Sequence, residues 1–132
     1  MTLKRTHAEH APTPIGGYVQ TVEVPTPGAL LFVSGQIGED TDGHVPDDAK
    51  AECRQAWRNV LAQLDAAGYG PGDLVRATVY LTGPDLVRPH QEARNEALGP
   101  VQPTLTVVVV SALADPRWHV EVVAMAARPT AS

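Results

Sequence analysis

Few side chains in this sequence combine a reactive type with a position where they could meet a ligand. His90 falls on the inner stripe of a predicted helix, and a histidine titrates near neutral pH, so it could act as a general acid or base. A packed or capping histidine explains that position at least as well. Ser34 and Gly35 end a predicted strand, where a hydroxyl and an open backbone N–H could face a ligand. A simple turn accounts for them equally well.

Three arginines are candidate cations for an acidic ligand, namely Arg88, Arg94 and Arg117. Arg94 is expected on the solvated side of its helix, and Arg117 lies in a predicted turn, where charge is common. We therefore favour surface positions for all three. Arg117 could still reach a cleft built from strand ends.

No residue pattern indicates a metal ion or another cofactor. Cys53 is the single cysteine, which excludes an internal disulfide and a zinc site built on cysteines, and no second histidine stands at ligand spacing from His90. Cys53 and Trp57 share an apolar helix face, so we expect an inert buried thiol and a core indole. Trp118 opens the last predicted strand and fits either a subunit interface or a cleft wall.

Length and composition indicate one small globular domain. The chain has 132 residues, of which 43% are hydrophobic and 19% charged. Its formal net charge of −5 disfavours nucleic acid as a partner. The polar residues 1–10 do not form a signal peptide, and the longest apolar run, Val107–Val110, is too short to span a membrane. The single cysteine suits the cytoplasm, and a chain this short would gain stability from burial in an oligomer.

Turn residues and apolar periodicity predict the elements of the first half. Residues 18–24 and 30–33 predict two strands, joined as a hairpin by a Pro/Gly turn. Acidic residues at Asp47–Asp48 suit the start of a following helix and Gly68 suits its end. The apolar residues of this helix repeat at spacings of three and four and are Cys53, Ala56, Trp57, Val60, Leu61 and Leu64.

The second half predicts a strand, a helix and two further strands. Residues 74–81 are rich in β-branched residues and suit a strand, and Asp85 can cap the helix that follows. The inner stripe of this helix is Leu86, His90, Ala93 and Ala97. Strands at residues 104–110 and 119–127 complete the order β-β-α-β-α-β-β. We expect an α/β (α+β) domain whose mixed sheet carries two helices on one face and a second subunit on the other.

Five segments, in family order along the chain, resemble the reactive intermediate deaminase family, also called the Rid, RidA-like or YjgF family. They are Ile15–Gln20, Leu31–Ile37, Asn59–Leu61 with Ala66–Gly68, Val75–Thr82 and Val120–Ala126. Each segment alone is weakly specific, whereas the set is specific for the fold. We accordingly divide the chain into a flexible N-terminal tail at residues 1–10, one Rid-like domain at residues 11–128 and a C-terminal tail at residues 129–132.

The resemblance implies a chorismate-mutase-like subunit that assembles as a homotrimer, with the sheets inside and the helices outside. It also implies clefts for a small-molecule ligand at the subunit interfaces, near which Tyr18 matches the family's tyrosine. The usual activity of the family is hydrolysis of reactive enamines and imines to a 2-keto acid and ammonia. Nucleic acid, membrane and cofactor are not expected partners.

The sequence departs from the family at two positions. Leu105 stands where the family has an arginine that pairs with the substrate carboxylate, and Val123 stands where a glutamate positions the attacking water. Losing only one of the two charges would leave the other buried and uncompensated. Because both charged residues are replaced by apolar ones, the sequence favours a pocket that is apolar throughout. Glu121 shares a strand face with Val123 and could reach the same cleft, although we favour a rim position for it.

Three functions follow from these residues. In the first, the protein acts on an imine, enamine or related intermediate with altered specificity, and Leu105 and Val123 line an apolar cleft. In the second, it is an ordinary 2-imino acid deaminase that uses Glu121 and a displaced arginine, for which Arg117 is the main candidate. In the third, it is a trimer that binds a ligand or regulates a partner without catalysis.

Overall fold

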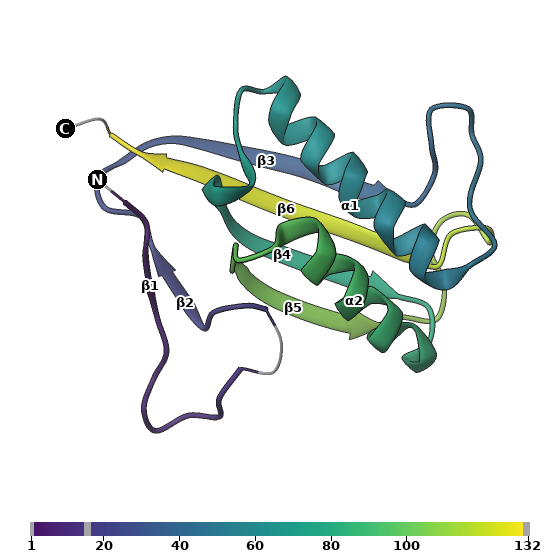
Figure 1. The fold of residues 1–132 in the computed structure, drawn as a ribbon, viewed down its shortest axis with the longest axis horizontal. Coiled ribbons are helices and arrows are strands. Elements are labelled where there is room, and N and C mark those ends of the chain that lie inside the picture. The colour runs from purple at the N-terminus through teal and green to yellow at the C-terminus, as the bar shows by residue number, and fades with distance from the viewer. Residues whose placement is uncertain (1, 15–16, 131–132) are drawn as a thin grey trace.

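A four-stranded mixed sheet with two helices on one face forms the centre of the computed structural model, which describes residues 2–14 and 17–130 (Figure 1). Ile15 and Gly16 of the first motif, and the end of the expected C-terminal tail, lie outside the described residues. The strand order is β3-β6-β4-β5. The expected α+β class, with both helices on one face of a mixed sheet, is confirmed.

The long strand β6 (Val120–Pro129) holds the sheet together. It pairs antiparallel with β3 (Pro27–Ile37) on one side and with β4 (Leu74–Leu81) on the other. Strand β5 (Thr104–Val109) pairs in parallel with β4. Strands β3 and β5 are therefore the two edges of the sheet.

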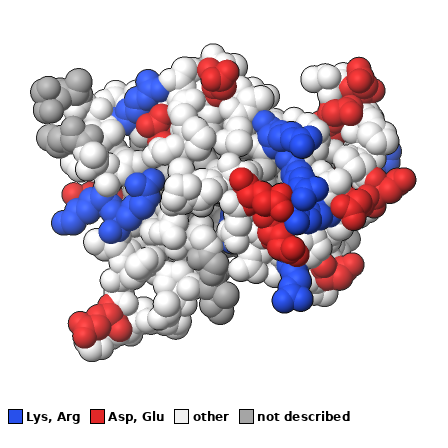
Figure 2. Space-filling model, viewed as in Figure 1, with Lys and Arg blue, Asp and Glu red and all other residues white. Residues whose placement is uncertain are grey.

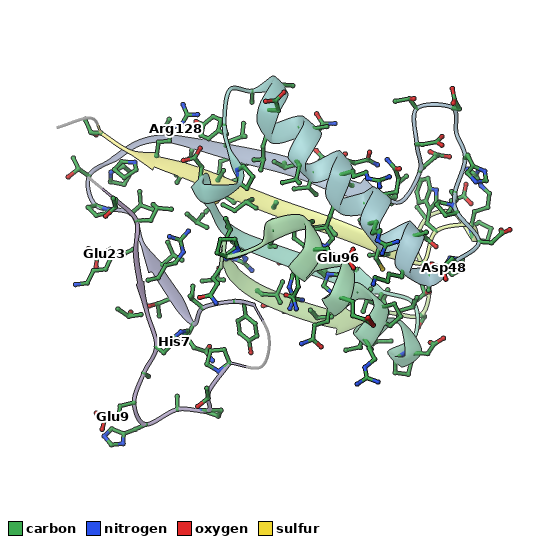
Figure 3. The ribbon with its side chains drawn as sticks, viewed as in Figure 1. His7, Glu9, Glu23, Asp48, Glu96 and Arg128 are labelled. Carbon is green, nitrogen blue, oxygen red and sulfur yellow. The ribbon has the colours of Figure 1, made fainter. Side chains whose placement is uncertain are left out.

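Helix α1 (Ala49–Ala66) has the face that its sequence predicts. Asp48 lies at its start (Figure 3) and caps it by accepting a hydrogen bond from the N–H of Ala51 at 2.9 Å. Gly68 follows its end with a φ of 82°. The residues that this helix buries are Glu52, Cys53, Ala56, Trp57, Val60 and Leu64. The apolar members of this set pack on the sheet and form most of the core with it.

Helix α2 (Val87–Leu98) lies beside α1 over the same face of the sheet (Figure 1). Pro89 falls in its first turn, where a missing N–H costs nothing. Asp85 does not cap it as expected, because Asp85 lies within the short 3₁₀ turn Pro84–Leu86 that precedes the helix. Basic and acidic side chains alternate over the two helices (Figure 2), where Glu96 pairs with Lys50 at 2.8 Å and with Arg54 at 2.9 Å.

The predicted N-terminal hairpin is wrong. Strand β2 (Thr21–Glu23) pairs antiparallel with β1 (Lys4–Thr6), which lies within the expected tail, and not with β3. The reason is a long-range contact: the N–H of Val19 donates to the carbonyl of Pro103 at 3.1 Å and holds this segment at the β5 edge of the sheet. The free side of β3 lies at the opposite edge of the sheet.

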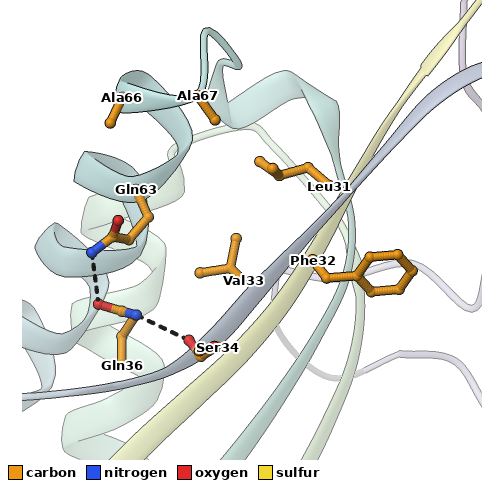
Figure 4. Close-up of a pocket in the computed structure, with 8 residues that line it drawn as sticks. All are labelled: Leu31, Phe32, Val33, Ser34, Gln36, Gln63, Ala66 and Ala67. Atoms are coloured by element: carbon orange, nitrogen blue, oxygen red, sulfur yellow. Dashed lines mark hydrogen bonds between the residues drawn. The ribbon is translucent and has the colours of Figure 1, made fainter.

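The face of the sheet opposite the helices carries exposed apolar side chains. Phe32 is 73% exposed and Leu30 is 53% exposed, and Val108 and Val123 are also exposed on this face. Figure 4 shows Phe32 pointing away from α1, whereas Leu31 and Val33 on the same strand point toward it. None of the described helices is both long and apolar enough to cross a bilayer.

Candidate active site

A pocket of about 320 Å³ opens between α2 and the edge strand β5. It brings together four side chains that the sequence singled out separately, namely Tyr18, His90, Arg94 and Leu105. The residues that line it are Tyr18, Val87, His90, Gln91, Arg94, Leu105 and Val107. The pocket therefore has one apolar wall from β5 and one more polar wall from α2.

The first motif places Tyr18 at the mouth of this pocket. Its neighbour Val19 forms a parallel bridge with Thr104 at the start of β5. On the other side, a Cβ atom on Gly17 would lie 2.8 Å from Oδ1 of Asn95 in α2, so a glycine allows the close approach. The backbone around Tyr18 is thus fixed between the same two elements that form the pocket walls.

His90 connects the pocket to the core. The indole Nε1–H of Trp57 donates to Nε2 of His90 at 3.2 Å, which leaves the imidazole proton on Nδ1. Burial, together with the charge of Arg94, lowers the pKa of His90 to about 3. His90 is therefore neutral near pH 7. Its Nε2, the nitrogen that would accept a proton, already accepts the hydrogen bond from Trp57 of α1.

Arg94 was predicted at the surface, and that prediction is wrong. The side chain follows His90 by one helical turn on the same face of α2 and is only 3% exposed. Its Nε has no hydrogen-bond partner among the described residues, and burial lowers the pKa of its guanidinium. The spacing of four from His90 was the sequence signal for this position.

A second pocket, of about 490 Å³, lies along the free edge of β3 beside the end of α1 (Figure 4). Ser34 lines it and belongs, with Gly35, to an irregularity in the pairing of β3 with β6. The side-chain amide of Gln36 donates to the carbonyl of Ser34 at 3.0 Å, and Gln63 donates to Gln36 at 3.4 Å. Ser34 and Gly35 are thus at the opposite edge of the sheet from Tyr18.

Glu121 lies against Gly35. A Cβ atom on Gly35 would be 2.7 Å from the carboxyl carbon of Glu121, so the bare backbone at residue 35 makes room for this carboxylate. Glu121 is half-buried and shares the open face of the sheet with Val123, two residues further along β6. The described residues therefore place one carboxylate beside the predicted Ser34–Gly35 site.

Arg117 lines neither of these two pockets. Its guanidinium pairs with Asp115 and with Glu39, each at 3.1 Å, and the bond with Asp115 raises the pKa of Arg117. The side chain is exposed, as we favoured from the sequence. A carboxylate of its own loop and one from the segment after β3 already pair with this cation.

The remaining reactive side chains form no metal site, because no group of three His, Cys, Asp or Glu among the described residues is placed to hold an ion. Cys53 is fully buried, and burial raises its pKa to about 12, which confirms an inert thiol. Trp57 is fully buried in the core as predicted. Trp118 is half-buried, and its indole N–H is buried without a partner among the described residues.

Sequence reasoning missed one buried carboxylate and the hydrogen bonds that it accepts. Glu52 is 2% exposed, and its carboxylate accepts hydrogen bonds from the backbone N–H of His119 at 2.7 Å and from Nδ1 of the same residue at 2.8 Å. The signal was present, since Glu52 precedes Ala56 by four residues and so continues the apolar stripe of α1. This pair joins the first turn of α1 to the start of β6.

Comparison with known proteins identifies relatives by sequence. A RutC family protein of Pyrococcus horikoshii is 38% identical over 107 residues, which are 80% of this chain and 82% of the relative. A 2-iminobutanoate/2-iminopropanoate deaminase of Salmonella typhimurium is 43% identical over 74 residues, 55% of this chain and 56% of that enzyme. The chain thus spans little more than half the length of the deaminase that it matches.

Solved structures share the whole fold. A protein of the conserved Rid family from Yersinia pestis, YyfB, has a TM-score of 0.84 at 26% identity, covering 96% of this chain and 99% of that one. TdcF of E. coli, solved with bound serine, has a TM-score of 0.72 at 31% identity, covering 95% and 98%. The family model described as Endoribonuclease L-PSP matches residues 8–128. The chain therefore belongs to this family, the Rid or YjgF family that its sequence segments indicate.

Proposed function

We propose that this protein hydrolyses imines or enamines of small organic molecules and releases ammonia. The observation that carries the proposal is the convergence of Tyr18, His90 and Leu105 on one pocket between α2 and β5. Relatives named as 2-iminobutanoate/2-iminopropanoate deaminases support the same chemistry.

The working unit in this proposal is a cyclic homotrimer in the cytoplasm. The polar groups of the expected site are divided between the two edges of the sheet, with Tyr18 at the β5 edge and Ser34, Gly35 and Glu121 at the β3 edge. A head-to-tail arrangement would place the β3 edge of one subunit against the α2–β5 pocket of the next. It would also cover Phe32 and the other exposed apolar side chains of the open face.

The reaction needs a water molecule, an acceptor for its proton and a donor for the leaving nitrogen. Water adds to the carbon of the C=N bond, and the resulting carbinolamine expels ammonia as its C–N bond breaks and a C=O bond forms. An enamine first takes a proton on carbon and becomes the imine. In this scheme Glu121 accepts the proton of water and then donates it to the leaving nitrogen. The N–H of Gly35 and the hydroxyl of Tyr18 orient the substrate, and the neutral His90 holds α2 in place.

Specificity differs from that of the usual deaminases in this proposal. Leu105 and Val107 form an apolar wall where the family resemblance places an arginine, and Val123 replaces the family's glutamate. A wall of this kind favours substrates with an aliphatic body over small, strongly polar ones.

RNA cleavage is the second candidate, because the matching family model is described as an endoribonuclease. The formal net charge of −5 disfavours it, and the face in Figure 2 mixes acidic with basic side chains. Incubation with a structured and a single-stranded RNA, with the relative rates of cleavage as the readout, distinguishes the two functions.

The proposal is tested by following the loss of 2-iminopropionate, 2-iminobutyrate and the imine of 4-methyl-2-oxopentanoate against the rate in buffer alone. An amino-acid dehydratase or oxidase generates each imine in place. We expect acceleration that is greatest for the branched substrate. An absence of acceleration with all three imines, from protein that is folded and assembled, would remove the proposed function.

A further inference from the structure

Arg94 is a cation without an anion in the described structure. Its side chain is 3% exposed, its Nε has no hydrogen-bond partner, and no described carboxylate lies within ion-pair distance of it. The two glutamates on the same helix face α1 instead: Glu92 lies 3.7 Å from Lys50, and Glu96 is shared by Lys50 and Arg54. A buried guanidinium with an unpartnered Nε and no carboxylate beside it destabilises a fold, so we infer that an anion from outside the described contacts of this subunit pairs with it.

The surroundings of Arg94 restrict what this anion can be. Its neighbour on the helix, His90, is uncharged near pH 7 because burial lowers its pKa to about 3. Leu105 and Val107 face α2 across the pocket and provide only aliphatic surface. One cation in an otherwise uncharged pocket suits an anion of charge −1 with an aliphatic body, and does not suit a phosphate of higher charge.

We propose that Arg94 binds the carboxylate of the substrate, so that the cation of the site comes from α2 and not from β5. The planar fork of the guanidinium forms a bidentate pair with the carboxylate, while Leu105 and Val107 contact the aliphatic side chain. The substrate class is then a 2-imino acid whose aliphatic side chain is longer than that of 2-iminobutyrate. This inference rests on the proposed function, because it names the substrate of the same pocket.

Binding of stable 2-oxo acids tests the assignment without any need for turnover. The assembled protein is titrated calorimetrically with 4-methyl-2-oxopentanoate, 2-oxobutanoate and the neutral 4-methyl-2-oxopentanamide. The two acids compare the effect of the ligand's side chain on affinity, and the acid and its amide compare the effect of the ligand's charge. We expect the branched acid to bind roughly tenfold more tightly than 2-oxobutanoate, since each buried methylene is worth about a factor of four. Arg94→Gln should weaken binding of both acids at least tenfold and leave the amide unchanged, whereas Arg88→Gln, which changes an exposed arginine on the same helix, should change neither.

Thermal unfolding gives a second readout if binding is weak. Arg94→Met should raise the unfolding temperature of the ligand-free protein, because it removes a buried charge that has no carboxylate partner, and should abolish any stabilisation by 4-methyl-2-oxopentanoate. A fall in the unfolding temperature with unchanged binding of the acids would show a structural partner for Arg94 and overturn the inference. Arg94-dependent binding together with no imine hydrolysis would remove the proposed function and keep the anion site. If Arg94→Gln hydrolyses the imines as fast as the natural protein, the anion site would be removed and the proposed function would stand.

Discussion

Leu105 and Val123 face opposite sides of the same sheet. In the register of the sheet, Leu105 lies beside Ala77 on β4, and Val123 lies beside the next residue, Thr78. Consecutive residues of a strand point to opposite faces, so Leu105 faces α2 whereas Val123 faces the open side. A cleft that contains both positions therefore requires two subunits.

Mixing two single variants tests this division. The double variant Leu105→Arg, Val123→Glu should hydrolyse 2-iminobutyrate at least tenfold faster than the natural protein, because it restores both charges that the family resemblance implies. When Leu105→Arg and Val123→Glu chains are unfolded and refolded together, about a quarter of the sites in a cyclic trimer should carry both charges. The rate of hydrolysis should then exceed the sum of the rates of the two separate variants.

The matched control is the same pair of variants, refolded separately and mixed afterwards, which should give no gain. An active double variant with no gain in the refolded mixture would place both residues in one subunit's cleft and contradict the division described above.

Assembly should depend on Phe32. This side chain is 73% exposed on the open face, and a charge at that position would be buried on trimer formation. Light scattering coupled to gel filtration should give a trimer for the natural protein and a smaller species for Phe32→Glu. Ala62→Glu, at an exposed position on α1, should remain trimeric. A trimeric Phe32→Glu variant would exclude the open face as the interface.

The elements with regular apolar periodicity were predictable from the sequence. The stripe of α1 follows the spacing of Cys53, Ala56, Val60 and Leu64, and β4 has the predicted bounds, because burial on one or both faces imposes a pattern that needs no knowledge of distant contacts. The hairpin was not predictable from local turn residues, since the contact of Val19 with Pro103 spans most of the chain.

Polar residues in the site were harder to predict than apolar ones. Arg94 and Glu52 both continue an apolar helical stripe, and a charged residue at such a position is usually placed at the surface because burial of an unpaired charge is costly. Glu52 is buried because His119, which directly precedes β6 and is distant in the sequence, provides two hydrogen bonds. Arg94 lies one turn after His90, and its burial can be recognised only when Tyr18 and β5 are known to line the same pocket.

The bond between Glu52 and His119 should stabilise the whole domain. Glu52→Leu leaves the backbone N–H of His119 without its acceptor and should lower the free energy of unfolding by about 2 kcal/mol. Glu52→Gln keeps one carbonyl oxygen for that N–H and should cost less. Urea denaturation followed by tryptophan fluorescence measures both, and Glu96→Gln, at an exposed ion pair, provides a control that should change stability little. Equal stability of Glu52→Leu and the natural protein would show that the bond has no structural role.

The stability of the protein should fall in acid because His90 is buried in its neutral form. Its pKa is lowered to about 3 in the folded protein, against about 6.5 in an unfolded chain. Between these two values the unfolded state binds the additional proton, so the free energy of unfolding decreases as the pH falls, by up to about 1.4 kcal/mol per pH unit. His90→Gln offers Trp57 an amide oxygen as acceptor and does not titrate, so its stability should depend less steeply on pH over this window. Urea denaturation at pH 4.5, 5.5 and 7.0 compares the two proteins, and equal slopes would mean that His90 takes up its proton in the folded state as readily as in the unfolded one.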